Sequence, residues 1–180
     1  MLSMRPAQKM KKAAEQRIRS EVKRLGNTPC FLFVCSGNTC RSVMAEAFFQ
    51  QCWELEDTPG KMQVCSAGLA TVEGLTASNE ALTLLQREGL KMENHRSRPV
   101  DTVMLKKADY IFTMTAVHKQ LILERFPRYG HKVWTLGEYG GVENDIADPY
   151  GGGMDAYQLA ASQIKKAIFG VMGRLGASSQ

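Results

Sequence analysis

The chain has 180 residues, of which 44% are hydrophobic and 23% are charged, with a net charge of +5 and five cysteines. This length suits one domain with a substantial core and is too short for two domains of ordinary size. No apolar run approaches the roughly 18 to 20 residues that a membrane-spanning helix needs. The N-terminal residues are charged where a secretory signal would be apolar. We therefore expect a soluble, cytoplasmic protein without stable membrane insertion.

The positive charge is concentrated at the N-terminus. Residues 1–28 contain eight lysines and arginines and two glutamates, a net charge of +6, so the remaining residues sum to −1. We interpret residues 1–28 as a basic extension, helical or disordered, that precedes a domain at 29–180. Its apolar spacing also fits an amphipathic helix at a membrane surface or against a partner. Because the domain itself is not basic, we expect no nucleic-acid partner.

The spacing of cysteines and histidines argues against two common classes of protein. The cysteines are odd in number and lack CxxC spacing, so a disulfide scaffold is not expected. The histidines, His95, His118 and His131, do not lie at ligand spacing from one another or from a cysteine pair, so we expect no metal site. Three cysteines are interpreted as small buried core residues: Cys30, Cys52 and Cys65.

From residue 30 onward, short apolar runs alternate with longer helical patterns, as in parallel α/β units. The run CFLFVC at 30–35 is apolar at consecutive positions, which is typical of a strand buried on both faces. The other predicted strands are 62–68, 109–114 and 132–136. The predicted helices are 41–53, 77–88, 116–125 and 155–175. This order predicts a three-layer α/β fold, a four-stranded parallel sheet with helices on both faces, with its ligand site at the carboxyl ends of the strands.

Residues 35–42, CSGNTCRS, connect the first predicted strand to the first predicted helix. The backbone N–H groups of such a loop, with the first turn of the helix, form an anion site. Gly37 and Asn38 tolerate the positive φ values that the loop requires. Neither GxxxxGK[ST] nor GxGxxG is present, so the loop is not one of the common nucleotide loops. Phosphate is the anion that we expect it to bind.

Cys35 and Arg41 supply the reactive groups of this loop. A thiol aimed at a helix N-terminus beside a guanidinium is largely ionised at neutral pH, and the thiolate is the nucleophilic form. A guanidinium binds two phosphoryl oxygens and follows them as they spread in the transition state. The C-x5-R spacing after a buried strand therefore predicts phosphoryl transfer to Cys35 while Arg41 holds the transferred group.

Residues 35–42, followed by Met-Ala-Glu at 44–46, resemble the phosphate-binding loop and first helix of the low-molecular-weight protein tyrosine phosphatase family. The resemblance extends from about Phe31 to the last predicted helix and includes Ser-Ala-Gly at 66–68. It implies a cysteine-dependent hydrolase of phosphorylated proteins that works through a phosphocysteine intermediate. Neither a metal nor an organic cofactor is implied. The oligomeric state stays open.

The resemblance also implies a general acid. Asp148-Pro149-Tyr150 resembles the late loop that carries it, so we expect Asp148 to protonate the leaving group and then to activate the water that cleaves the phosphocysteine. Glu143 and Asp145 are interpreted as solvated loop acids, and Asp155 as an acid at the start of a helix.

Other residues of the loop take supporting roles by resemblance. Asn38, Ser42 and His95 match a hydrogen-bonded network that holds the loop in shape, with the Ser42 hydroxyl available to the thiolate. Cys40 matches a second loop cysteine that can form a reversible disulfide with the nucleophile. The candidate phosphate- and substrate-binding residues are Ser36, Gly37, Asn38, Thr39, Cys40, Ser42 and Tyr150.

Thr39 bears on which phosphorylated side chain is hydrolysed. Most tyrosine-directed members carry a bulkier aliphatic residue there, and threonine resembles the bacterial protein-arginine-phosphatase branch. A smaller side chain with a hydroxyl leaves room and a polar contact for a planar guanidinium. Residues 69–72, LATV, lack the aromatic wall that both branches often have, and Val43 replaces a usual proline. We favour phosphoarginine as the substrate and keep phosphotyrosine as the alternative.

Two further functions are weighed against these. Arsenate reductase shares the fold and a similar loop, but it needs additional cysteines in a later loop, and the last cysteine of this chain is Cys65. A catalytically silent phosphate-binding module usually lacks the nucleophile, the arginine or the acid, whereas this sequence has candidates for all three.

Overall fold

The computed structural model describes residues 28–55 and 61–177. The predicted basic extension therefore lies, except for Thr28, outside the described residues. None of the helices in the described part of the chain is both long enough and apolar enough to cross a membrane.

The centre of the molecule is a parallel sheet of four strands in the order β2-β1-β3-β4. The strands are β1 (Cys30–Cys35), β2 (Gln63–Gly68), β3 (Tyr110–Thr113) and β4 (Val133–Thr135). Each confirms a predicted strand to within a residue or two at either end. In the centre of the sheet, Phe33 of β1 pairs with Ser66 of β2 on one side and with Phe112 of β3 on the other.

The four predicted helices are present, at α2 (Arg41–Leu55), α3 (Asn79–Arg87), α5 (Ala116–Arg125) and α7 (Gly153–Ala177). Three shorter helices were not predicted: α4 (Thr102–Lys107), the 3-10 helix η1 (Pro127–Lys132) and α6 (Leu136–Gly140). Elements of five or six residues are too short to show a helical period, so only their capping residues could have indicated them. Asp101 and Thr135 do cap α4 and α6 through their side chains.

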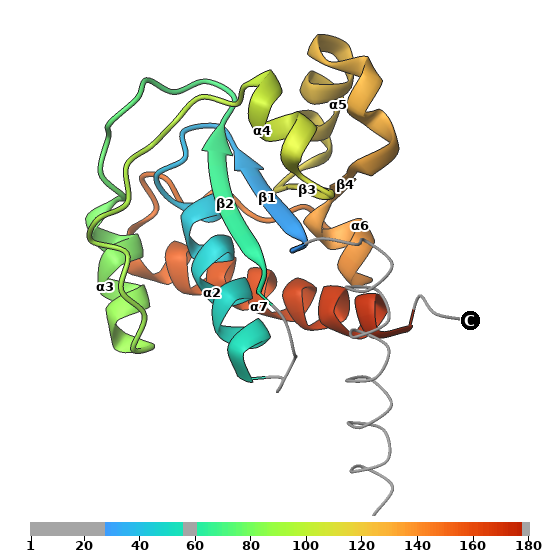
Figure 1. Ribbon diagram of the computed structural model, residues 1–180. Coiled ribbons are helices and arrows are strands. Elements are labelled where there is room, and N and C mark those ends of the chain that lie inside the picture. Colours follow the sequence, from blue (N-terminus) through green and yellow to red (C-terminus); the bar gives the residue numbers. More distant parts are fainter. Residues whose placement is uncertain (1–27, 56–60, 178–180) are drawn as a thin grey trace, which may run out of the picture.

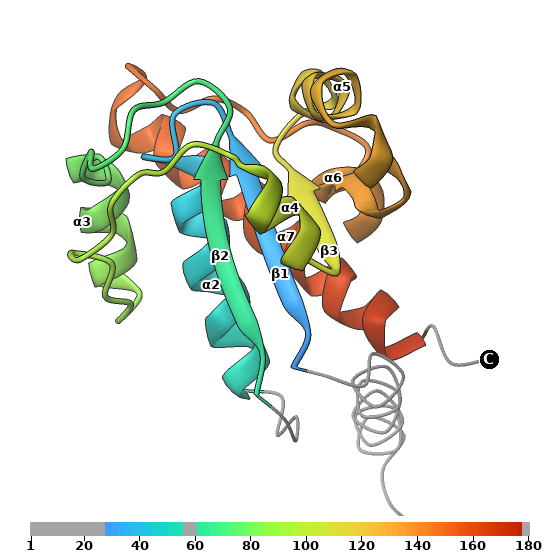
Figure 2. The same cartoon turned by 45° about the horizontal axis from the view of Figure 1, so that its top comes forward.

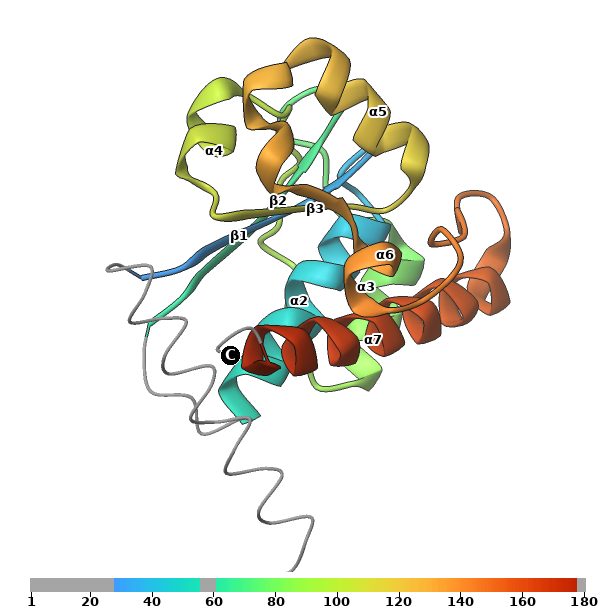
Figure 3. The same ribbon diagram turned by 90° about the vertical axis from the view of Figure 1, so that its right-hand side faces the viewer.

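Alternate residues of β1 build the two cores that flank the sheet. Phe31 and Phe33 pack in a cluster with residues of α2, α3, α6 and α7, whereas Leu32 and Val34 pack with residues of α4, α5 and η1. Figures 1 and 3 show the same division, with α4 and α5 on one side of the sheet and the long helix α7 on the other. The predicted three-layer α/β fold is confirmed.

Backbone hydrogen bonds beyond the sheet bring two distant segments to the carboxyl end of β1. Leu69 and Ala70 donate to the carbonyls of Cys35 and Ser36, which holds the segment after β2 against the loop. The N–H of Ile146 donates to the Met114 carbonyl, which brings the segment that precedes Asp148 to the same edge. Figure 2 shows the loops that follow β1 and β2 at the carboxyl ends of these strands.

Candidate active site

The loop of residues 35–42 lies between β1 and α2, as the sequence predicts. Asn38 is the residue with positive φ, at 54°, whereas Gly37 does not need this conformation. The Cys35 thiol is buried; its Sγ accepts the N–H of Asn38 at 3.3 Å and lies 3.0 Å from the Ser42 hydroxyl. The loop therefore places both a backbone and a side-chain donor on the sulfur.

The Asn38 side chain fixes the direction of the hydrogen bonds behind the loop. Its Nδ2 donates to the hydroxyl oxygens of Ser42, at 3.0 Å, and Ser66, at 2.8 Å. Ser66 in turn donates to the Glu46 carboxylate at 2.5 Å. Because the Ser42 oxygen already accepts from Asn38, its proton is free to point at the Cys35 sulfur. The order of donors thus directs the Ser42 hydroxyl, like the Asn38 N–H, towards the Cys35 sulfur.

Ser66 and Glu46 were not assigned to the site from the sequence. Burial raises the pKa of Glu46, and the Ser66 hydroxyl and the charge of Arg98 oppose that rise. Both lie outside the loop, and their contact with Asn38 depends on how α2 packs on β2, which no local pattern encodes. The matches at 44–46 and 66–68 were the only signal in the sequence.

His95 lies behind the loop, as the resemblance implied. Its Nε2 is 2.8 Å from the backbone carbonyl of Asn38. Burial, with the charges of Arg98 and Arg96, lowers the pKa of His95 against the effect of the Asn38 carbonyl. A neutral ring with its proton on Nε2 donates to that carbonyl, while the Arg98 N–H donates to the Asn38 side-chain oxygen at 3.0 Å. Asn38 is therefore held in its uncommon conformation by α2 through Ser42, by β2 through Ser66 and by the segment that carries His95 and Arg98.

Arg41 and Asp148 form an ion pair at the mouth of the loop. Arg41 Nη2 lies 2.6 Å from Asp148 Oδ2, and the side chains are 6% and 55% exposed, respectively. Arg41 Nη1 also donates to the Ile146 carbonyl at 3.3 Å. The predicted acid, 107 residues after Arg41, is thus beside the predicted nucleophile loop. A phosphoryl group that binds the loop would compete with Asp148 for the guanidinium.

Most of the predicted site residues line one cavity of about 230 Å³. Asn38, Ser42 and His95 lie behind this cavity and support it. Tyr150 is 82% exposed at its rim. The lining residues are Cys35, Ser36, Gly37, Thr39, Cys40, Arg41, Ala70, Asp148 and Tyr150.

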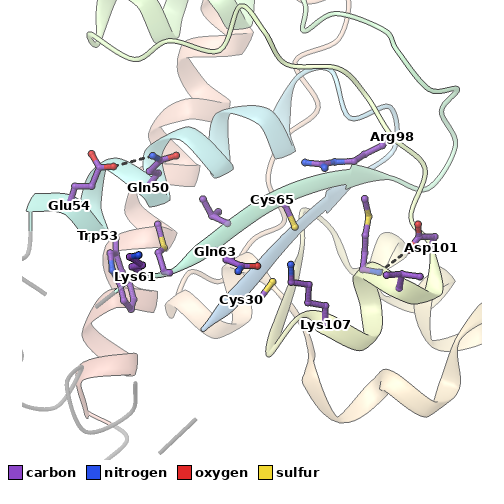
Figure 4. A pocket seen from close by; sticks show the side chains of 14 residues that line it. Cys30, Gln50, Trp53, Glu54, Lys61, Gln63, Cys65, Arg98, Asp101 and Lys107 are labelled. Atoms are coloured by element: carbon purple, nitrogen blue, oxygen red, sulfur yellow. Dashed lines mark hydrogen bonds between the residues drawn. The ribbon is translucent and has the colours of Figure 1, made fainter. Parts of the chain in front are cut away.

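A larger cavity, of about 750 Å³, lies along the edge strand β2 and contains none of the predicted site residues. Figure 4 shows side chains from β1, β2, α2 and α4 around it, with Cys30 and Cys65 near its centre. Its lining includes neither the loop of residues 35–42 nor Asp148, so the smaller cavity is the candidate active site.

The thiol of Cys40 is directed towards α7. Its Sγ lies 3.1 Å from the Tyr157 hydroxyl and donates to Ser78 at 3.5 Å. Cys35 and Cys40 are both free thiols and line the same cavity. A disulfide between them stays a prediction, and forming it would break the contact with Tyr157.

Several predictions for single residues are corrected or refined. Asp145 is exposed, but its carboxylate accepts the N–H of Ala116 at 2.9 Å and so caps α5. Asp155 lies in the first turn of α7, as predicted. Cys30 is buried, whereas Cys52 and Cys65 are only partly buried, because they lie at the edge of the sheet and on its covering helix rather than in the centre. Among the described residues, no cluster of three acids, histidines or cysteines could hold a metal ion.

A parallel α/β fold with a C-x5-R loop at the end of its first strand is the arrangement of a cysteine-dependent phosphatase. A family model described as low molecular weight phosphotyrosine protein phosphatase matches residues 31–180. The chain belongs to this family, and it is a protein phosphatase of the cysteine-dependent class.

Three relatives illustrate the range of the family. The chain is 38% identical over 138 residues to a protein-arginine-phosphatase of Geobacillus stearothermophilus, covering 76% of this chain and 89% of the relative. It is also 38% identical over 133 residues to a low molecular weight protein-tyrosine-phosphatase, PtpB, of Staphylococcus epidermidis, covering 74% and 89%. A cysteine-to-serine mutant of the YwlE arginine phosphatase with a phosphorylated active-site serine superposes with a TM-score of 0.78 at 34% identity, covering 83% and 97%.

Proposed function

We propose that the protein hydrolyses phosphoarginine side chains of proteins, with Cys35 as nucleophile, Arg41 as the phosphoryl-binding cation and Asp148 as general acid and base. The observation that carries this proposal is the shared cavity, which a buried thiol, a buried guanidinium and a half-exposed carboxylate line together with other residues of the loop.

The contacts of Arg41 suggest an order of events. When the phosphoryl group binds the loop amides, its oxygens replace Asp148 as partners of the guanidinium. Asp148 is then free to protonate the leaving group while Cys35 attacks phosphorus in line. In the second step the same carboxylate accepts a proton from the water that hydrolyses the phosphocysteine. The phosphorylated serine in the YwlE mutant supports a covalent intermediate at the matching loop position.

Thr39 supports phosphoarginine over phosphotyrosine. It is partly buried on the wall of the cavity, and its hydroxyl makes one long contact, 3.5 Å to the Cys40 sulfur. A hydroxyl so weakly engaged is available to a guanidinium N–H. The similarity to a protein-arginine-phosphatase points in the same direction.

Phosphotyrosine hydrolysis is the second candidate. The exposed Tyr150 ring lies at the rim of the cavity, where it can stack on an aromatic substrate. Ala70 is the residue that the segment after β2 contributes to the lining, and Tyr150 is the one aromatic ring that borders the cavity within the described residues. The similarity to a protein-tyrosine-phosphatase supports this candidate.

The test compares kcat/KM on phosphoarginine and phosphotyrosine peptides of identical flanking sequence. We expect the wild type to prefer phosphoarginine and Thr39→Ile to reverse the preference by closing the space beside the loop. Thr39→Val keeps the shape and removes the hydroxyl, so it separates the polar contact from the space. Unchanged selectivity in Thr39→Ile would contradict the role of Thr39, and a wild-type preference for phosphotyrosine would favour the second candidate.

A further inference from the structure

The proposed mechanism leaves one buried histidine beside the loop without a role. His118, in the first turn of α5, is 6% exposed, and its Nε2 lies 2.8 Å from the Ser36 hydroxyl. Its Nδ1 is buried and has no hydrogen-bond partner in the described residues. Ser36 follows Cys35 and lines the cavity. The ring therefore touches the phosphate loop through a single side-chain contact.

Hydrogen bonds of the backbone fix the first turn of α5, which carries His118. Thr115 caps α5 by accepting the N–H of His118 at 3.2 Å, and Asp145 accepts the N–H of Ala116. The residue before the cap, Met114, donates its N–H to the Val34 carbonyl of β1. The first turn of α5 is thus tied to the strand that ends at Cys35, and the ring keeps its place beside Ser36.

The surroundings of His118 determine which ring nitrogen carries the proton. Burial and the charge of Arg41 lower the pKa of His118 against the effects of Asp148 and Asp145, which favours the neutral ring. A buried N–H without an acceptor is tolerated less well than a buried lone pair without a donor. The proton therefore belongs on Nε2, which donates to the Ser36 oxygen.

We propose that His118 is a positioning residue that turns the Ser36 hydroxyl into a donor for the bound phosphoryl group. Because the Ser36 oxygen accepts from His118, its own proton is directed away from the ring, towards the cavity. The hydroxyl then adds a charge-assisted hydrogen bond to those of the loop amides and Arg41. This inference rests on the proposed phosphate site, to which it adds His118 and a specific role for Ser36.

His95 provides a built-in comparison because it reaches the same loop in a different way. It contacts the Asn38 backbone carbonyl, behind the cavity, and so supports the shape of the loop. His118 contacts a side chain that lines the cavity. Removing His95 should therefore weaken phosphate binding whether or not Ser36 is present, whereas removing His118 should do so only through Ser36.

The test is a double-mutant cycle on the affinity for inorganic phosphate, measured by calorimetry in the full chain. We expect His118→Leu and Ser36→Ala each to weaken phosphate binding about 10-fold, as for loss of one hydrogen bond to a charged group. His118→Leu in the Ser36→Ala background should cost nothing more. His118→Gln keeps an N–H donor and should retain affinity within about 3-fold. His95→Gln should lose affinity equally in both backgrounds.

A second readout separates positioning from a general loss of structure. The sulfur of Cys35 contacts Ser42 and the Asn38 N–H but not Ser36, so the rate of iodoacetamide alkylation of Cys35 should be unchanged in His118→Leu. Unchanged phosphate affinity in His118→Leu, equal losses in both Ser36 backgrounds, or a parallel fall in alkylation rate would each overturn the inference. Because these readouts need no turnover, a wild type that binds phosphate without hydrolysing phosphopeptides would contradict the proposed function alone.

Discussion

Two polar loops meet at the same edge of the sheet and are built in opposite ways. In the loop of residues 35–42, Asn38 and Ser42 are fully buried, and the Asn38 side chain donates to two hydroxyls and accepts one backbone N–H. In the segment of residues 148–153, the Asp148 side chain is 55% exposed, and Gly151 has positive φ with open space around it. The first loop is held by many contacts and the second by few.

This difference matches the part of the substrate that each loop is proposed to contact. The phosphoryl group is the same in every substrate. Hydrogen-bond donors that are already held in place therefore need not rearrange during the reaction. The leaving group varies with the substrate protein, so an exposed segment that carries one acid can adjust to it. The predictions that follow disturb one loop or the other and ask whether this contrast persists.

The largest effect is expected from the reacting groups of the buried loop. Cys35→Ser should lower kcat on p-nitrophenyl phosphate by about 10⁴-fold or more, because a hydroxyl replaces the nucleophile. Arg41→Lys should lower it by about 10³-fold, because an ammonium lacks the planar fork with which a guanidinium binds two phosphoryl oxygens side by side. Steady-state kinetics measure both losses. Turnover retained in Cys35→Ser would show that this thiol is not the nucleophile.

Asp148→Asn should have the next largest effect, a fall in kcat of about 10²-fold on phosphopeptides, because protonation of the leaving group is lost. The fall should be smaller on p-nitrophenyl phosphate, whose leaving group needs little help. Asp145→Asn is the matched control, since this nearby acid caps α5 and does not line the cavity. Equal losses in the two variants would argue against Asp148 as the acid.

Substitutions in the two loops should differ clearly in their effect on the free energy of unfolding. Asn38→Gly keeps the freedom to adopt positive φ but leaves Ser42 and Ser66 without their shared donor, so it should cost about 2–4 kcal/mol of unfolding free energy. Gly151→Ala, at φ 77° with no atom nearby, should cost only about 1 kcal/mol of backbone strain. Urea unfolding measures both changes. Similar costs would show that the two loops do not differ in stability.

The smallest expected effect is on the pH dependence of stability. Burial lowers the pKa values of His95 and His118 from the ordinary 6.5, so the unfolded chain binds protons more readily than the folded one. Their contribution to stability is therefore complete above pH 6.5 and is lost as pH falls through the folded-state values. Glu46 acts in the opposite sense, because burial raises its pKa above 4.5 and the folded state holds the proton more tightly.

Comparing variants isolates the histidine contribution from that of Glu46. The loss of stability between about pH 7.5 and pH 5.5 should be smaller in His95→Gln and in His118→Gln than in the wild type. Urea titrations at the two pH values provide the measurement. An equal loss in all three proteins would mean that neither histidine titrates differently in the folded state.

Much of the fold and of the reactive loop could be predicted from the sequence because the signals are local. The apolar run of β1, the C-x5-R spacing and the long helical periods each lie within one segment, and the structure confirms the strands and helices that they predict. Asp148 was placed by resemblance to a family motif. The short helices α4 and α6 lack a period of their own, and only tertiary packing establishes them.

Tertiary structure alone added three further residues to the support of the loop. Glu46, Ser66 and His118 are separated from the residues they contact by 20, 28 and 82 positions, respectively. No spacing rule relates such positions, because their distance depends on how the helices pack on the sheet and where the strands end. The sequence by itself thus determined the C-x5-R loop and predicted which of its groups react, and the packing of α2, β2 and α5 around β1 determined how the hydrogen bonds of the loop are directed.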